Sequence, residues 1–227
     1  MKKVKAKKHL GQHFLKDISI AEKIVNQLRI KENTILEIGP GMGVLTQFLI
    51  NHYKNLYLIE IDKESVFYLR LYYPKSKIIE GDFLKLDLNK FKNNISIIGN
   101  FPYNISSQIL FKSFHNRDKV TELVGMFQKE VAERIACVQG KKRGILSILL
   151  QTFYDIEYCF TVDNLLFEPP PKIKSAVIKM KRNNRKKLDC DEEIFIKVVK
   201  TGYNQRRKTL RNALKSFTLN VNHNMNK

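Results

Sequence analysis

The four residues Asn100-Phe101-Pro102-Tyr103 follow an apolar run, ISIIG, and precede a second apolar pattern. Hydrophobic burial alone does not require a polar amide, a proline and an aromatic ring in this order. The Asn100 side-chain oxygen can accept a hydrogen bond, Pro102 fixes a backbone turn, and Tyr103 offers a flat aromatic face. We interpret the motif as a device that holds a planar, polar molecule at the end of a strand. The alternative is a capped helix start in which Tyr103 only packs.

A second candidate site consists of glycines and a following acid. Gly39, Gly41 and Gly43 stand between the run TILEI and a helical pattern, where glycine lets the backbone turn tightly and approach a ligand. Glu60 ends the next predicted strand, in LYLIEID. From there a carboxylate can accept hydrogen bonds from both ribose hydroxyls of an adenosine cofactor. Glycines alone are also consistent with a structural turn, and the acid at this distance favours the cofactor.

The glycine spacing distinguishes two kinds of adenosine cofactor. Dinucleotide sites have G-x-G-x-x-G, whereas this chain has G-P-G-M-G with Glu37 leading. E-x-G-x-G-x-G resembles the first motif of S-adenosylmethionine-dependent methyltransferases. In the turn Gly81-Asp82-Phe83, Asp82 can accept a hydrogen bond from the adenine amine and Phe83 can pack on the ring, although Gly-Asp is also common turn chemistry. A nicotinamide-dependent dehydrogenase is the remote alternative.

The elements that must position these residues form an alternating pattern. Five strand-like runs between residues 34 and 128 alternate with four stretches of helical periodicity, which predicts a parallel sheet covered by helices. Open sheets of this kind bind ligands at the carboxyl ends of their strands, where the motifs above lie. The runs are TILEI, LYLIEI, SKIIE, ISIIG and TELVGMF, and the helices are expected near 43–51, 63–71, 105–115 and 129–137.

The remaining third of the chain changes pattern. Residues 154–162 and 173–181 are strand candidates with no helix between them, which predicts an antiparallel edge. KRNNRKKLDCD is the expected linker. From Asp191 the pattern is helical, with a break at Thr201-Gly202 and a second amphipathic piece that contains Leu210, Leu214 and Phe217.

The charge of the chain points to a polyanionic partner. Its 41 Lys and Arg against 22 Asp and Glu give a formal net charge of +19, and a field of that sign attracts nucleic acid. The basic residues cluster in four blocks, which favours nucleic-acid contacts over general surface solvation. The blocks are residues 2–8, 141–143, 181–187 and 204–227.

Other compositional features exclude several classes of protein. No apolar run approaches about 18 residues, so we expect no membrane span. The lysine-rich start is followed by HLGQHFLKD rather than an apolar segment, so we expect no secretory signal and a cytoplasmic protein. Cys137, Cys159 and Cys190 form no CxxC pair and are odd in number, which argues against disulfides and a zinc site. We expect no metal.

Together the motifs resemble those of the ribosomal RNA adenine dimethyltransferase family. Asn-Phe-Pro-Tyr is similar to the (N/D/S)-P-P-(Y/F) signature of methyltransferases that act on exocyclic amino groups of bases. The closest likeness is to the small-subunit (16S) rRNA N6,N6-adenine dimethyltransferases, and the large-subunit rRNA methyltransferases share the core. The resemblance extends over nearly the whole chain, in GQHFLKD (11–17), EIGPGMGVLT (37–46), IEID (59–62), GDF (81–83), GNFPYNISS (99–107), MFQKEVAERI (126–135), FEPPPKIKSAV (167–177) and NQRRKTLRNAL (204–214).

The resemblance implies a mechanism. The Asn100 side-chain oxygen and the backbone carbonyl of Phe101 would each accept one N–H of an adenine amine, so that the nitrogen lone pair points at the cofactor's methyl group. Pro102 would fix this turn. Tyr103 would stack on the flipped adenine, and Phe167 would cover the opposite face of the base.

The resemblance also implies cofactor and RNA contacts. The residues expected to line the S-adenosyl-L-methionine pocket are His13, Leu15, Gly39, Gly41, Glu60, Asp82 and Asn100. Many relatives have Asn where this chain has His13. The residues expected to contact RNA are Lys172, Arg206, Arg207 and Arg211.

The expected fold is α/β, a Rossmann-like methyltransferase fold with a seven-stranded, mostly parallel sheet and a small helical C-terminal domain. We expect the methyltransferase domain, with its basic N-terminal arm, at 1–182 and an RNA-docking domain at 188–227. The second domain is expected to be shortened, because relatives continue with further helices. The expected partner is 16S rRNA in the 30S subunit or its precursor, bound by a monomer. The alternatives are a catalytically silent RNA-binding assembly factor with the same fold and a large-subunit rRNA adenine methyltransferase.

Overall fold

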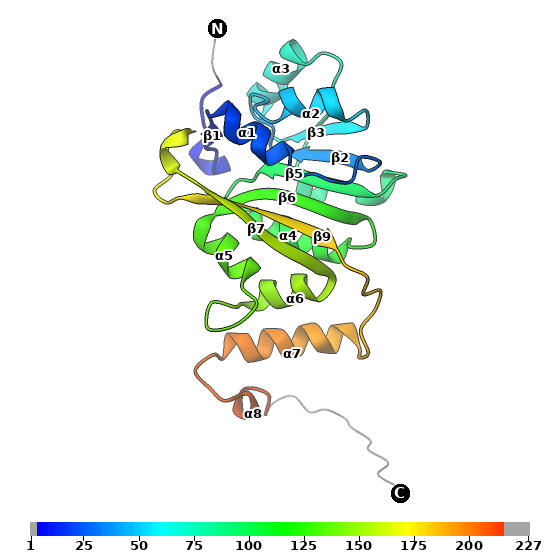
Figure 1. Cartoon of the computed structure of the whole chain (residues 1–227), viewed down its shortest axis with the longest axis vertical. Coiled ribbons are helices and arrows are strands. Elements are labelled where there is room, and N and C mark those ends of the chain that lie inside the picture. Colours follow the sequence, from blue (N-terminus) through cyan, green and yellow to red (C-terminus); the bar gives the residue numbers. More distant parts are fainter. Residues whose placement is uncertain (1–3, 216–227) are drawn as a thin grey trace, which may run out of the picture. The chain divides into compact units, whose positions relative to one another are not determined.

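A seven-stranded sheet forms the centre of the first of two compact units, residues 1–184 and 185–227, in the computed structural model, which describes residues 4–215 (Figure 1). The strand order is β4-β3-β2-β5-β6-β9-β7. The strands are β2 (Thr34–Ile38), β3 (Leu56–Glu60), β4 (Lys77–Glu80), β5 (Ile95–Asn100), β6 (Val120–Gln128), β7 (Tyr154–Val162) and β9 (Ser175–Arg182).

The predicted mixed sheet is confirmed. β4, β3, β2, β5 and β6 pair in parallel, and β9 pairs antiparallel with both β6 and β7. All five residues of β2 are buried, as expected for a central parallel strand covered on both faces. The carboxyl ends of β2 to β5 therefore lie along one edge of the sheet. The glycine turn, Glu60, the Gly81-Asp82-Phe83 turn and the Asn100 motif lie at these ends.

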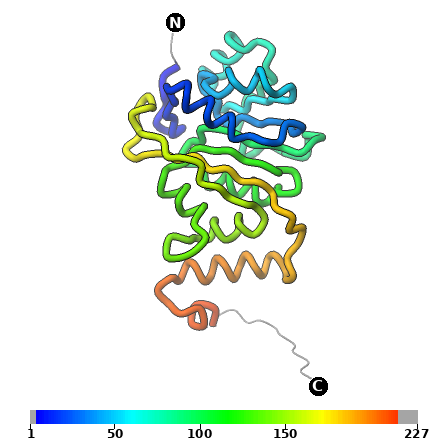
Figure 2. The backbone as a smooth tube through the Cα atoms, in the orientation of Figure 1, coloured from blue at the N-terminus to red at the C-terminus, as the bar shows by residue number. Residues whose placement is uncertain are grey.

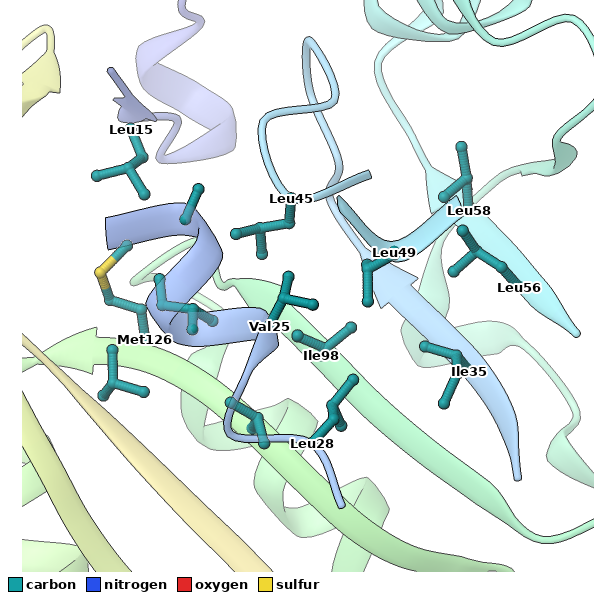
Figure 3. Close-up of a cluster of buried hydrophobic side chains, with 14 of the residues drawn as sticks. Leu15, Val25, Leu28, Ile35, Leu45, Leu49, Leu56, Leu58, Ile98 and Met126 are labelled. Atoms are coloured by element: carbon teal, nitrogen blue, oxygen red, sulfur yellow. The ribbon is translucent and has the colours of Figure 1, made fainter. Parts of the chain in front are cut away.

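Helices cover both faces of this sheet (Figure 1). Side chains from α1 (Ile18–Val25), α2 (Thr46–His52) and α3 (Lys63–Tyr72) join strand residues such as Ile35 and Ile98 in one apolar cluster (Figure 3). On the other face, α4 (Ser106–His115) and α5 (Lys129–Ala136) each pack against α6 (Ile145–Phe153). The sequence prediction contained neither α1 nor α6.

A short two-stranded sheet joins distant parts of the chain. β1 (Phe14–Leu15) pairs antiparallel with β8 (Phe167–Glu168). Figure 2 shows the N-terminal segment beside the loop that follows β7. Single 3-10 turns cover Lys8–Leu10, Phe83–Lys85, Leu88–Lys90 and Asn164–Leu166. The pairing fixes the N-terminal arm (residues 4–15) next to the proline-rich loop (residues 169–174).

The second unit contains α7 (Glu192–Asn204) and α8 (Leu210–Ala213). The predicted break at Thr201-Gly202 is wrong, because α7 continues through it. A glycine inside a helix costs only about 1 kcal/mol relative to alanine, and α7 packs against α8 at this point, with Leu210 close to Gly202. Phe217 lies outside the described residues. Within residues 4–215, every helix is too short or too polar to cross a membrane.

Candidate active site

A cavity of about 920 Å³, open space at its mouth included, lies at the carboxyl ends of β2, β3, β4 and β5. It brings together the glycine turn, the acid at the end of β3, the turn after β4 and the Asn100 motif. The N-terminal arm closes one side. Its walls come from residues 10–14, 38, 39, 41, 59–61, 81–84 and 100–105.

The glycine turn needs its glycines. Gly39, Gly41 and Gly43 have φ values of 65°, 57° and 81°, a left-handed region that other residues rarely adopt. A Cβ at Gly41 would lie 2.7 Å from the ring of Phe14 in the arm. The turn is therefore shaped both by backbone conformation and by the close approach of the arm.

Glu60 fixes this turn to the end of β3. Its Oε2 accepts a hydrogen bond from the backbone N–H of Gly41 at 3.0 Å, and its Oε1 accepts from the N–H groups of Ile61 and Asp62, both at 2.9 Å. Burial raises the pKa of this carboxyl, and the three N–H donors act against that shift. Each carboxylate oxygen can accept two hydrogen bonds, so Oε2 retains capacity for one hydroxyl group of a ligand.

The turn after β4 forms an apolar wall with a polar end. Asp82 caps this turn by accepting the N–H of Leu84 through Oδ1 at 2.8 Å. Lys112, on α4, donates to the carbonyls of Leu84 at 2.9 Å and Leu86 at 2.5 Å, and its ammonium lies 5.1 Å from the centre of the Phe83 ring. Burial lowers the pKa of Lys112. No local pattern in the sequence indicates this brace, because Lys112 occupies an ordinary helical position.

A smaller cavity of about 350 Å³ lies between the arm and the glycine turn, and Leu15, Glu37 and Asn100 line it. Leu15 is buried in the core. Glu37 is also buried, and its Oε2 accepts a hydrogen bond from Thr46 Oγ1 at 2.7 Å. Burial raises the pKa of Glu37 to about 8, and the nearby Glu60 adds to the increase. Glu37 is therefore protonated at neutral pH.

The Asn100 amide faces the cavities in a defined orientation. Its Nδ2 donates to the backbone carbonyl of His13 at 2.7 Å. Oδ1 accepts no hydrogen bond from the described residues, 4–215, which leaves that oxygen as an acceptor. The sequence analysis did not identify this role of the His13 backbone, because a main-chain carbonyl has no sequence signature.

Two contacts hold the Tyr103 side chain, one at its hydroxyl group and one at its ring. Its Oη lies 2.6 Å from Ser175 Oγ on β9, and the His13 imidazole stacks on it with 5.5 Å between ring centres and 27° between planes. His13 Nδ1 lies 2.8 Å from the carbonyl of Pro169. Ser175 and Pro169 are partners that the sequence motif did not reveal.

The two residues between Asn100 and Tyr103 anchor the motif. Phe101 is buried and contacts Phe127 edge to face, with 5.2 Å between ring centres. A Cβ on Gly125 would lie 2.2 Å from the Phe101 ring, so that glycine makes room for it. Pro102 lines the cavity and lies beside the glycine turn, where a Cβ on Gly39 would be 3.8 Å away.

Phe167 lies elsewhere than expected. The sequence prediction placed it over the target base, opposite Tyr103, but its side chain is fully buried in the core and does not line the cavity. The pairing of β8 with β1, which sets Phe167 opposite Leu15, turns the ring inward. Lys172 follows in the same loop, exposed and outside the cavity wall.

The arginines expected to contact RNA belong to the second unit. Arg206, Arg207 and Arg211 are exposed, and the Arg206 guanidinium lies 5.4 Å from the centre of the Tyr203 ring. The residues that line the cavity all belong to the first unit. Among residues 4–215, no three His, Cys, Asp or Glu side chains are grouped so that they could hold a metal ion.

With this geometry established, comparison with known proteins identifies the family. The model of the ribosomal RNA adenine dimethylase family matches residues 3–227. The chain belongs to this family. The ribosomal RNA small subunit methyltransferase A of Cytophaga hutchinsonii is 58% identical over 226 residues, which cover 96% of this chain and 88% of the relative. The protein of the same name from Parabacteroides distasonis is 58% identical over 220 residues and covers 95% and 83%.

Solved structures agree with the fold. A dimethyladenosine transferase from Plasmodium falciparum is 30% identical with a TM-score of 0.78, covering 89% of this chain and 75% of that protein. The 23S rRNA methyltransferase ErmE has a TM-score of 0.76 at 23% identity, with 89% and 84% covered, and this likeness concerns the fold alone. The predicted Rossmann-like methyltransferase fold is confirmed.

Proposed function

We propose that this protein transfers methyl groups from S-adenosylmethionine to the N6 nitrogens of two adjacent adenines near the 3′ end of 16S rRNA. One observation carries the proposal: a single cavity is lined both by the glycine turn with its acids and by the Asn100 motif. An adenosine cofactor and a base amine can therefore meet in one place. Family membership and the small-subunit relatives support the choice of rRNA as substrate.

The cofactor side of the cavity suits S-adenosylmethionine. Glu60 Oε2 has capacity for a ribose hydroxyl, and Asp82 can accept the adenine amine through the oxygen that does not cap the turn. Ile61, 51% exposed although apolar, faces the cavity together with Phe83 and offers a surface for the adenine ring. Gly39 lets the backbone approach the methionine end. When bound, the cofactor supplies an electrophilic methyl group on a positively charged sulfur.

The other side of the cavity suits an adenine amine. An exocyclic amine is a weak nucleophile because its lone pair is delocalised into the ring. Asn100 Oδ1 and the carbonyl of Phe101 would each accept a hydrogen bond from one N–H of the amine, which directs the lone pair at the methyl group. Stacking on Tyr103, worth about 1–3 kcal/mol, would offset the few kcal/mol needed to flip the base. In this proposal, the orientation of the reacting groups and electrostatic stabilisation account for the rate acceleration.

Recognition of the rRNA depends on charge in this proposal. The net charge of +19 favours a polyanion, and Lys172, Arg206, Arg207 and Arg211 are exposed and suited to phosphate contacts. The proposed substrate form is the 30S subunit or its precursor, bound by a monomer in the cytoplasm, with the second unit as an RNA-docking element.

The test uses labelled S-adenosylmethionine and small subunits that lack the dimethyl modification. Wild type is expected to label 16S rRNA at adenine N6. Asn100→Ala is expected to lower the rate by about 100-fold or more, the usual cost of losing one group that polarises the reacting centre, while S-adenosylhomocysteine still binds. If wild type binds the particles and the cofactor but transfers no label, the protein is an assembly factor and the proposal fails.

A further inference from the structure

We propose that Lys112 is a positioning residue that sets how selectively the cofactor site recognises adenine. This inference rests on the proposed function and deepens it, because it assigns part of the fit for S-adenosylmethionine to a lysine that does not line the cavity. The residues that would touch the adenine, Asp82 and Phe83, lie in the turn after β4. Lys112 reaches this turn from α4, 26 to 28 residues further along the chain.

The turn after β4 is a single 3-10 turn, Phe83–Lys85, which is a weak element by itself. The Lys85 N–H donates to the carbonyl of Asp82 at 3.1 Å. The Leu86 N–H donates to the carbonyl of Phe83, also at 3.1 Å. Hydrogen bonds in a 3-10 turn have poorer geometry than those in an α-helix. The shape of this turn therefore depends on partners outside it.

Lys112 binds two carbonyl groups and one ring of this turn. Its Nζ donates to the carbonyls of Leu84 at 2.9 Å and Leu86 at 2.5 Å. The same ammonium lies 5.1 Å from the centre of the Phe83 ring, within the range of a cation–π attraction. The Leu84 N–H donates to Asp82 Oδ1 at 2.8 Å. Leu84 is therefore held at both its N–H and its carbonyl, and Asp82 is tied through it to Lys112.

The helix that carries Lys112 provides a fixed support. Ile109, Leu110 and Phe114 of α4 are fully buried, and α4 packs against α6. Lys112 is half-buried. Burial lowers the pKa of Lys112, and the nearby charge of Asp82 acts against that shift. An ammonium withdrawn from water loses free energy if it gives up its acceptors, so the lysine holds the turn to the helix.

These contacts predict that Lys112 affects selectivity as well as affinity. Asp82 distinguishes an amine, which donates a hydrogen bond to a carboxylate, from a carbonyl oxygen, which cannot donate one. The distinction is strict only where the carboxylate is held in place. Without Lys112 the turn relaxes, so Asp82 meets the adenine amine less well and excludes a carbonyl less strictly. A lysine that served stability alone would weaken the binding of both ligands equally.

The experiment measures two Kd values by calorimetry on the full chain. The ligands are S-adenosylhomocysteine and S-inosylhomocysteine, in which a carbonyl replaces the adenine amine. Wild type is expected to prefer S-adenosylhomocysteine by about 100-fold, since a site built for an N–H rejects the analogue that lacks it. Lys112→Met keeps an unbranched chain and removes the ammonium. It is expected to weaken S-adenosylhomocysteine about tenfold and to lower the preference to about tenfold.

Methyl transfer to unmodified small subunits separates affinity from chemistry. In Lys112→Met, the KM for S-adenosylmethionine is expected to rise about as much as the Kd for S-adenosylhomocysteine. The kcat is expected to fall much less, because the Asn100 motif is intact. Lys112→Arg keeps a charged donor and is expected to recover most of the affinity and most of the preference.

The matched control is Lys119→Met. Lys119 is also half-buried and also donates to two carbonyls, those of Phe91 at 3.0 Å and Lys92 at 3.4 Å. These carbonyls belong to the segment before β5, and neither they nor Lys119 line the cavity. The control variant is expected to change neither of the two Kd values nor the KM.

The inference is overturned if wild type shows no preference between the two ligands or if Lys112→Met keeps the full preference. It is also overturned if Lys119→Met lowers the preference equally, if kcat falls while KM and both Kd values stay the same, or if Lys112→Arg recovers nothing. If the methionine variant does not fold, Lys112→Gln, which keeps one uncharged donor, is compared with Lys112→Arg. A lower preference is expected in the glutamine variant, and equal values would contradict the inference. Wild type that shows the preference but transfers no label would instead refute the proposed function alone.

Discussion

The two sides of the cavity are built from contacts of very different sequence range. On the cofactor side, the hydrogen-bond partners of Glu60 are 19, 1 and 2 residues away in the sequence. The hydrogen-bond partner of Asp82 is 2 residues away. On the target side, the separations are 87 residues for Asn100 with His13 and 72 for Tyr103 with Ser175.

This difference indicates how each side works. The cofactor side is a local motif whose acids hold backbone turns in shape, so damage to it is expected to weaken cofactor binding. The target side depends on long-range contacts of Asn100 with the arm and of Tyr103 with β9. Damage to it is therefore expected to lower kcat while cofactor affinity is retained. The following predictions test that separation.

The largest effect is expected for Glu60→Ala. The change leaves the N–H groups of Gly41, Ile61 and Asp62 without their acceptor, and hydrogen bonds to a charged group are worth about 1.5–3 kcal/mol each. The Kd for S-adenosylhomocysteine, measured by calorimetry, is expected to rise about 100-fold. The control Glu80→Ala removes the register partner of Glu60 on β4, which does not line the cavity. Equal affinities for the two variants would break the comparison.

The next effect concerns the buried acid Glu37. Its folded-state pKa of about 8 lies above the ordinary 4.5, so between these pH values the folded chain keeps a proton that the unfolded chain has lost. Stability therefore falls as pH rises through that window. In Glu37→Gln, the glutamine oxygen can still accept the hydrogen bond from Thr46, and the side chain does not titrate, so stability does not fall in this way.

From pH 6 to pH 8, the unfolding free energy of wild type is expected to fall by about 2 kcal/mol more than that of Glu37→Gln, given a slope of at most about 1.4 kcal/mol per pH unit. Urea denaturation measures the difference. Glu32→Gln, at an exposed position, is expected to follow wild type. Parallel curves for wild type and Glu37→Gln would show that Glu37 is ionised in the folded protein.

The smallest effect is expected for Tyr103→Phe, which keeps the ring and removes the contact with Ser175. A neutral hydrogen bond is worth about 0.5–1.5 kcal/mol, so kcat is expected to fall about threefold to tenfold with unchanged S-adenosylhomocysteine affinity. Ser175→Ala should give the same loss, and the double variant no more. Tyr158→Phe, which removes an exposed hydroxyl contact with Thr161 on β7, is the control. A loss of cofactor affinity in Tyr103→Phe would contradict the separation of the two sides.

Elements with a strong local pattern were predictable, and those defined by packing were not. The strand 154–162 was predicted with the bounds that β7 has, because its alternation and its boundaries are local. α6 was missed because an apolar run of this length is compatible with a helix or a strand, and its packing against α4 and α5 decides the outcome. The predicted break at Thr201-Gly202 was wrong because packing of α7 against α8, and not the local pattern, decides where α7 ends.

The sequence by itself determined the family, the sheet and the position of the glycine turn, Glu60, Asp82 and Asn100 at strand ends, because glycine conformation, strand alternation and short-range hydrogen bonds are properties of neighbouring residues. Only the tertiary structure decided that Phe167 is buried, that Lys112 braces the turn after β4 and that the His13 ring stacks on Tyr103. These outcomes depend on which distant segments lie side by side. The pairing of β1 with β8 is such a long-range contact, and no local pattern encodes it.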